Sequence, residues 1–79
     1  MKYLAGTIAE VVNDGAIATL ILDTGSHQHH LHADPRLLAE ALTALYGEED
    51  CVGKSVAVQC EGSILASIEI PGAAPDYAI

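Results

Sequence analysis

Residues 34–47 read DPRLLAEALTALYG, and this stretch separates two groups of strand-like segments. Asp34 is a favourable N-cap residue, and Pro35 suits the first position of a helix. Leucines at positions 38, 42 and 45 recur at helical spacing, and Gly47 is a typical residue to follow a helix. The stretch therefore predicts a single helix over residues 35–46.

Three strand-like runs precede the predicted helix, over residues 3–13, 16–22 and 27–33. Turn residues separate them: Asn13-Asp14-Gly15 between the first two, and Asp23-Thr24-Gly25-Ser26 between the second and the third. Gly6 lies inside the first run, where a glycine indicates a bend or a bulge.

Two more runs follow the helix, over residues 55–61 and 63–70, with Glu61-Gly62 as the turn. Pro71 ends the last strand, and residues 71–79 are typical of a loose tail. The sequence therefore predicts one β-rich domain over residues 1–70 followed by a C-terminal tail.

The expected order is strand, strand, strand, helix, strand, strand. This order predicts a mainly β fold with one helix (α+β): a five-stranded antiparallel OB-like barrel, or a curled sheet with the helix across one face. The segments VGKSVAV (52–58) and GSIL (62–65) resemble the last hairpin of small OB-like domains.

The composition excludes several classes of function. The chain has 79 residues, with three Lys and Arg against eleven Asp and Glu, for a formal charge of −8. A chain of this length forms one small domain. Nucleic-acid phosphates and anionic membranes both require clusters of basic residues, so neither is expected as a direct partner. Without Trp or Phe, the chain also lacks the aromatic platform of a nucleic-acid-binding OB domain.

The beginning of the chain has no apolar run typical of a signal peptide, which indicates a cytoplasmic protein. Two cysteines are too few for a disulfide framework. We expect Cys51 and Cys60 to be reduced, with Cys60 as a small core residue.

Histidines cluster at positions 27, 29, 30 and 32. On a strand, His30 and His32 share one face and could hold two ligands of a metal site, with Asp23 or Asp34 as a third. The cupin family uses such a pair, but its following glutamate is missing here. The other interpretation is a polar strand whose histidines contact solvent or a partner, and we expect no metal or other cofactor.

Catalytic motifs are weak. The sequence has no Gly-x-Ser-x-Gly elbow. The segment from Gly47 to Ser55 has one residue too many for a phosphate-binding P-loop, and it carries three carboxylates. The sequence therefore predicts a protein without enzymatic activity.

The acidic residues are the strongest remaining signal. Most of them are predicted to lie in turns or on the outer side of strands, where their field attracts basic surfaces. We expect them to form a binding surface for a basic protein that handles nucleic acid. The predicted contacts are Glu48, Glu49 and Asp50, supported by Asp14, Asp23 and Glu61.

In its size, its acidity and its lack of catalytic motifs, the chain resembles the small phage-encoded anti-CRISPR proteins. Some of these compact acidic inhibitors block the DNA-binding surface of a CRISPR effector complex. The resemblance implies a phage protein that acts in the cytoplasm of the host cell, with a subunit of the effector complex as its partner.

The second strand has apolar residues on both faces. Ala18, Leu20 and Leu22 share one face, whereas Ile17 and Ile21 share the other. A strand that is apolar on both faces needs cover on both. One interpretation is a central strand beneath the helix, and the other is a homodimer that forms through Ile17 and Ile21.

Overall fold

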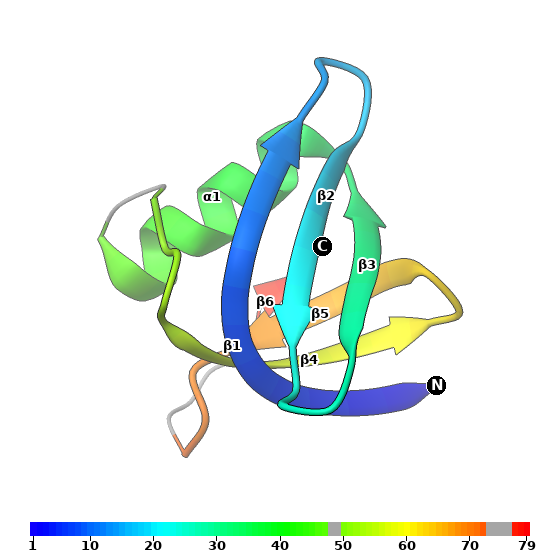
Figure 1. The fold of residues 1–79 in the computed structure, drawn as a ribbon. Helices are drawn as coiled ribbons and strands as arrows, with labels where there is room; N and C mark the ends of the chain where they lie inside the picture. The colour runs from blue at the N-terminus through cyan, green and yellow to red at the C-terminus, as the bar shows by residue number, and fades with distance from the viewer. Residues whose placement is uncertain (48–49, 73–76) are drawn as a thin grey trace.

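The computed structural model describes residues 1–47, 50–72 and 77–79. It is a closed barrel of five strands with one helix and a short sixth strand (Figure 1). The elements are β1 (Lys2–Asn13), β2 (Ala18–Asp23), β3 (Gln28–Ala33), α1 (Pro35–Tyr46), β4 (Ser55–Glu61), β5 (Ile64–Glu69) and β6 (Tyr77–Ala78). The predicted OB-like order of strands and helix is confirmed.

The strands are hydrogen-bonded in the order β3-β2-β1-β4-β5-β6. Neighbours in this order are antiparallel, and a short parallel pairing between β3 and β5 closes the barrel. At the closure, His32 pairs with Ile64, and the backbone N–H of His32 donates to the carbonyl oxygen of Ser63 at 2.7 Å.

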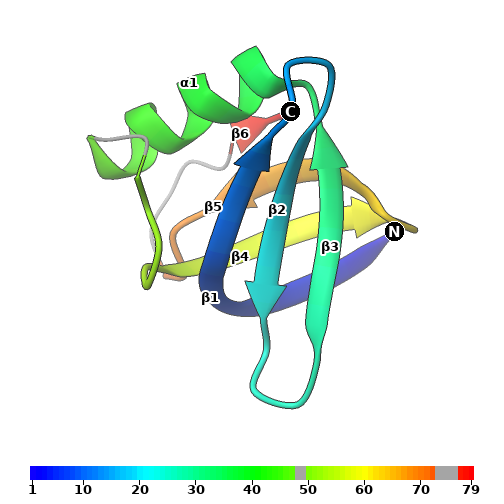
Figure 2. The ribbon, with the colours of Figure 1, turned by 45° about the horizontal axis from the view of Figure 1, so that its top comes forward.

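Strand β1 belongs to both halves of the barrel and bends strongly between them (Figures 1 and 2). Its first half, Lys2 to Thr7, pairs with β4, and its second half, from Thr7 to Asn13, pairs with β2. A register shift between Ile8 and Glu10 marks a bulge just after the bend. The bend predicted from the glycine is confirmed.

Gly6 of β1 lies against the C-terminal end of β2, at Asp23 and Thr24. A Cβ atom at this position would collide with the backbone carbonyl of Asp23. Glycine therefore allows the end of β2 to approach β1 closely enough to continue the sheet around the bend.

The core fills the barrel and extends beneath the helix. Alternate residues of β2 face inward, so that Ala18, Leu20 and Leu22, which were predicted to share one face, are buried. The helix contributes Leu38 and Leu42 to the same cluster. Helix α1 thus lies against one end of the barrel, beside the C-terminal half of β1 (Figure 2).

Both helix ends match the sequence-based prediction. The Asp34 carboxylate accepts hydrogen bonds from the backbone N–H groups of Arg36 and Leu37, at 3.0 and 3.1 Å. Gly47 follows the helix in the left-handed conformation, with φ of 79°. These contacts satisfy backbone groups that a helix end leaves without internal partners.

The C-terminal residues differ from the expected loose tail. Residues 77–78 pair with Ile68 and Ser67 of β5, and the backbone N–H of Ile79 donates to the Ala66 carbonyl oxygen at 2.9 Å. The half-buried Ile79 packs against the core. The edge of β5 is thus hydrogen-bonded to the C-terminal residues 77–79. No pattern in residues 71–79 predicts this pairing.

Candidate functional site

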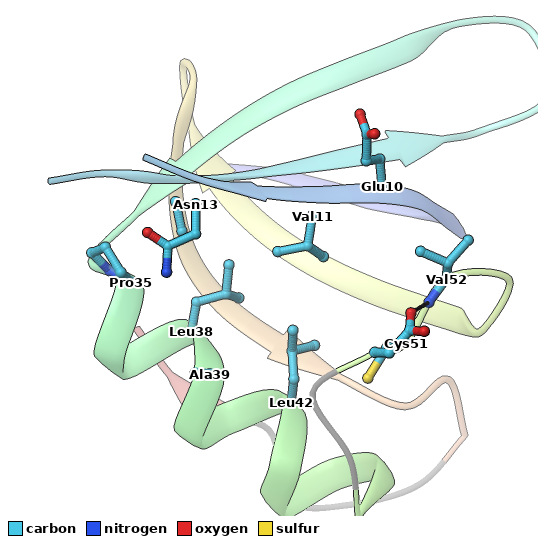
Figure 3. A pocket seen from close by; sticks show the side chains of 11 residues that line it. Glu10, Val11, Asn13, Pro35, Leu38, Ala39, Leu42, Cys51 and Val52 are labelled. Carbon is cyan, nitrogen blue, oxygen red and sulfur yellow. Dashed lines mark hydrogen bonds between the residues drawn. The ribbon is translucent and has the colours of Figure 1, made fainter. Parts of the chain in front are cut away.

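A pocket of about 390 Å³ lies between helix α1 and the C-terminal half of β1 (Figure 3). Strand, helix and the loop before β4 all contribute to its wall. The lining residues are Glu10, Val11, Asn13, Ala18, Pro35, Leu38, Ala39, Leu42, Asp50, Cys51 and Val52. The sequence analysis did not predict this pocket, because its walls come from segments that are distant along the chain.

The centre of the pocket is apolar. Leu38 and Leu42 extend from the helix toward β1, and Val11 extends from β1 toward the helix (Figure 3). The two leucines are four residues apart, which places them on one side of the helix. Val11 pairs with the buried Leu20, so it lies on the inner side of the sheet.

The two ends of the pocket differ in chemistry. At one end, the Asn13 side-chain oxygen accepts a hydrogen bond from the backbone N–H of Gly15 at 2.8 Å. At the other end lie Cys51, which is buried, and Val52, which is 56% exposed. Asp50 is exposed beside them, and its carboxylate is 3.5 Å from the backbone nitrogen of Val52. An apolar group in the pocket would therefore have a carboxylate at its rim.

Glu10 lies on β1 next to Val11, but its carboxylate points away from the helix, on the opposite side of the strand (Figure 3). Glu10 thus lines the pocket without directing its charge into it, and its carboxylate is a second exposed negative charge nearby.

The far end of the helix is fixed to the barrel by Tyr46. Its hydroxyl group donates a hydrogen bond to the carbonyl oxygen of Ser55 at 2.6 Å. Desolvation raises the pKa of the Tyr46 hydroxyl, with a smaller electrostatic contribution from Cys51. The phenol therefore remains protonated near neutral pH and holds α1 against the start of β4.

Both cysteines are buried in the core as thiols. Cys60 on β4 is a core residue, as predicted. Cys51 also belongs to the core, at the wall of the pocket, although the acidic segment before it gave no indication of burial.

The predicted acidic contacts lie on several sides of the barrel. Asp14 lies in the β1–β2 turn and Asp23 at the end of β2, so the two are at opposite ends of that strand (Figure 1). Glu61 is exposed at the β4–β5 turn, and Asp50 lies beside the pocket. Glu48 and Glu49 lie outside the described residues.

Asp14 is held in a defined position by its turn. Its carboxylate accepts hydrogen bonds from the backbone N–H groups of Ile17 and Ala16, at 2.8 and 2.9 Å. These bonds, with that of Ile17 as the largest contribution, lower the pKa of Asp14 below its ordinary value of 3.8. The turn thus carries a fixed negative charge.

The histidines lie on and beside β3. The Nδ1 atom of His32 is 3.0 Å from the hydroxyl oxygen of Thr19 on β2, and the rings of His27 and His29 stack with centroids 6.3 Å apart. Within residues 1–47, 50–72 and 77–79, no group of three His, Cys, Asp or Glu side chains is arranged to hold a metal ion.

The outer face of the first three strands carries exposed apolar residues. Ile17 is 49% exposed and Ile21 is half-buried. Val12 and Ile64, which are 45% and 58% exposed, lie in one cross-strand row with Thr19 and His32. The sequence analysis predicted the isoleucines on this face but not the valine or Ile64.

In the part of the chain that the structure describes, no helix is both long enough and apolar enough to span a membrane. Comparisons with protein-family models, with curated proteins and with solved structures found no match to this chain.

Proposed function

We propose that this chain is a non-enzymatic acidic protein that binds a basic, nucleic-acid-handling protein and inhibits it. The observation that carries the proposal is the charge of −8 on a small folded body. Asp14, Asp50 and Glu61 are exposed at turns and loops between elements. Such charges speed the encounter with a basic surface and repel nucleic acid.

The side of the barrel that holds the pocket is the proposed contact surface. Asp50 lies at the rim of the pocket, and the Glu10 carboxylate projects from the neighbouring part of β1. Glu48 and Glu49 precede Asp50 directly, so residues 48–50 are the largest local concentration of acidic residues in the sequence. Asp14, Asp23 and Glu61 add to the long-range field from other sides.

The first target to test is a CRISPR effector complex in the cytoplasm of a bacterial host. This choice follows from the resemblance in size and charge to anti-CRISPR proteins. A protein that occupies the groove for target DNA would compete with DNA and would need no active site of its own.

The test measures the affinity of the chain for a purified effector complex. It also measures whether the bound chain prevents the complex from binding target DNA. The double variant E48K/D50K should bind at least about tenfold more weakly than the wild-type chain, with a smaller dependence on salt. The double variant E40K/E69K has the same net charge change and serves as the matched control. It should keep most of the affinity, provided that both variants retain the wild-type melting temperature.

Two outcomes would contradict the proposal. One is that the wild-type chain binds neither the effector complex nor any other basic DNA-binding protein at low salt. The other is an E48K/D50K variant that binds as tightly as the wild-type chain.

A second function, assembly into a homodimer, is favoured by the exposed apolar residues on the outer face of β1, β2 and β5. Val12, Ile17 and Ile64 are each at least 45% exposed, and exposed apolar clusters are typical of interaction surfaces. Light scattering across a concentration series tests this alternative. A dimer that the double variant I17S/I64S converts to a monomer would support it, and a monomeric wild-type chain would exclude it.

A further inference from the structure

We propose that the pocket between α1 and β1 holds an apolar side chain from a basic segment of the partner protein, with a lysine or arginine next to that side chain reaching Asp50. This inference rests on the proposed function and names the chemistry that the partner must present. The occupant is a short segment in which a leucine or a similar residue directly precedes basic residues.

The pocket is large enough to admit a side chain. Its volume of about 390 Å³ lies near the lower end of the range for small-molecule sites. Leu38 and Leu42, each 1% exposed, form its floor, and the more accessible Val11, Ala39 and Val52 line its walls. A single apolar side chain could therefore rest against apolar surface from the strand, the helix and the loop before β4, as an anchor residue does at a protein interface.

The mouth of the pocket favours an occupant that belongs to a larger surface. Val52 is 56% exposed at one end, and Leu37 on the neighbouring part of the helix is 38% exposed. A partner segment that enters the pocket would cover Val52 at the same time, because Val52 itself lines the pocket. Removing this apolar surface from water would favour binding.

The charges around the pocket select a basic segment. Among the described residues that line it, Glu10 and Asp50 are acidic and none is basic. The Glu10 carboxylate lies on the outer side of β1 (Figure 3). Asp50 lines the pocket beside Val52, in the loop before β4. A cation beside the anchor side chain would meet Asp50 at the exposed rim, where such a contact contributes more to specificity than to affinity.

The probe is a capped peptide of sequence Gly-Ser-Gly-Leu-Arg-Arg-Gly-Ser-Gly, titrated into the ¹⁵N-labelled chain and followed by NMR. The largest shifts are expected at the backbone amides of Val11, Leu38 and Val52. A peptide with serine in place of the leucine should bind at least about fivefold more weakly. A second peptide, with glutamine in place of both arginines, should be weakened to a similar extent.

Variants of the chain provide a matched comparison. A39F fills the pocket from the helix and should weaken binding of the leucine peptide at least about tenfold. A44F makes the same change at an exposed helix position outside this pocket, and it should bind as the wild-type chain does. If A39F fails to fold, V52S removes an exposed apolar contact at the mouth and should weaken the same peptide.

The inference is overturned if the serine peptide binds as well as the leucine peptide, or if a folded A39F (or V52S in its place) retains wild-type affinity. Failure of the proposed function looks different. If A39F binds the basic partner protein with wild-type affinity and salt dependence, the pocket inference is wrong and the acidic surface stands. If E48K/D50K binds that partner as the wild-type chain does, the proposed function itself is wrong.

Discussion

The substitution G6A tests the bend that allows β1 to serve both halves of the barrel. A Cβ atom at Gly6 would collide with the carbonyl group of Asp23 and would lie 3.1 Å from the Cα atom of Thr24. Both neighbours are backbone atoms, so the clash is relieved only if the end of β2 and its turn move away from β1. Overpacking of this kind costs about 1–3 kcal/mol.

A smaller entropy of the unfolded chain partly offsets this loss of stability. Alanine restricts the unfolded chain more than glycine does, which returns about 0.4–1 kcal/mol to the folded state. We expect a net loss of about 1–2 kcal/mol in the free energy of unfolding. For a domain of this size, each kcal/mol lowers the melting temperature by about 4–8 °C, so a decrease of about 10 °C is expected.

Equilibrium unfolding in urea, followed by circular dichroism, measures the free-energy change. G62A is the control, because a Cβ at Gly62 meets no atom within 4 Å but its φ of 61° is left-handed. That conformation costs an alanine about 1–2 kcal/mol, without any need for the turn to move. Only G6A should therefore shift the amide NMR signals of Asp23 and Thr24. A G6A variant with wild-type stability and unchanged signals there would refute the reasoning.

Two further substitutions test local contacts. D34A removes the acceptor for two backbone N–H groups at the start of α1 and should cost about 1 kcal/mol of stability by thermal unfolding, whereas D34N should restore most of it; equal stabilities of D34A and the wild-type chain would contradict the assigned cap. The turn around Asp14 lowers the pKa of its carboxyl group below the ordinary value of 3.8. The ionised carboxylate therefore stabilises the folded state at pH values above 3.8, and this stabilisation is lost as the pH falls through the lowered pKa. The melting temperatures of D14N and the wild-type chain should therefore differ at neutral pH and converge as the pH falls below the ordinary value, and a difference that does not change with pH would show that the charge has no such role.

Local patterns were sufficient to predict most elements. Asp34, Pro35 and Gly47 define the helix ends through contacts within a few residues, and the structure has the same bounds for the helix. The alternation of Ala18, Leu20 and Leu22 likewise predicted that they share one face of β2, and this face is the buried one. These predictions succeeded because each depends on neighbours along the chain rather than on distant contacts.

The prediction for the C-terminal residues failed for the opposite reason. Residues 71–79 have no strand-like pattern, yet residues 77–78 pair with β5. A two-residue strand gains its stability from the edge beside it, and that edge exists only in the folded barrel.

The candidate site shows the same division. The sequence predicted Asp50 as an acidic contact, but it gave no sign that Asp50 lies at the rim of a pocket with Val11 and Leu42. The positions of Asp14 and Asp23 at opposite ends of β2, by contrast, agree with the turns predicted on either side of residues 16–22.

The sequence by itself determined the charge of −8, the order of strands and helix, and the residues that begin and end the helix, because composition and short-range periodicity are properties of the chain. The tertiary structure alone decided where the barrel closes, that the end of β2 approaches β1 at Gly6, and where a pocket opens between α1 and β1. These features arise from segments that are far apart in the chain and meet only when the core is packed, so no local pattern encodes their distances.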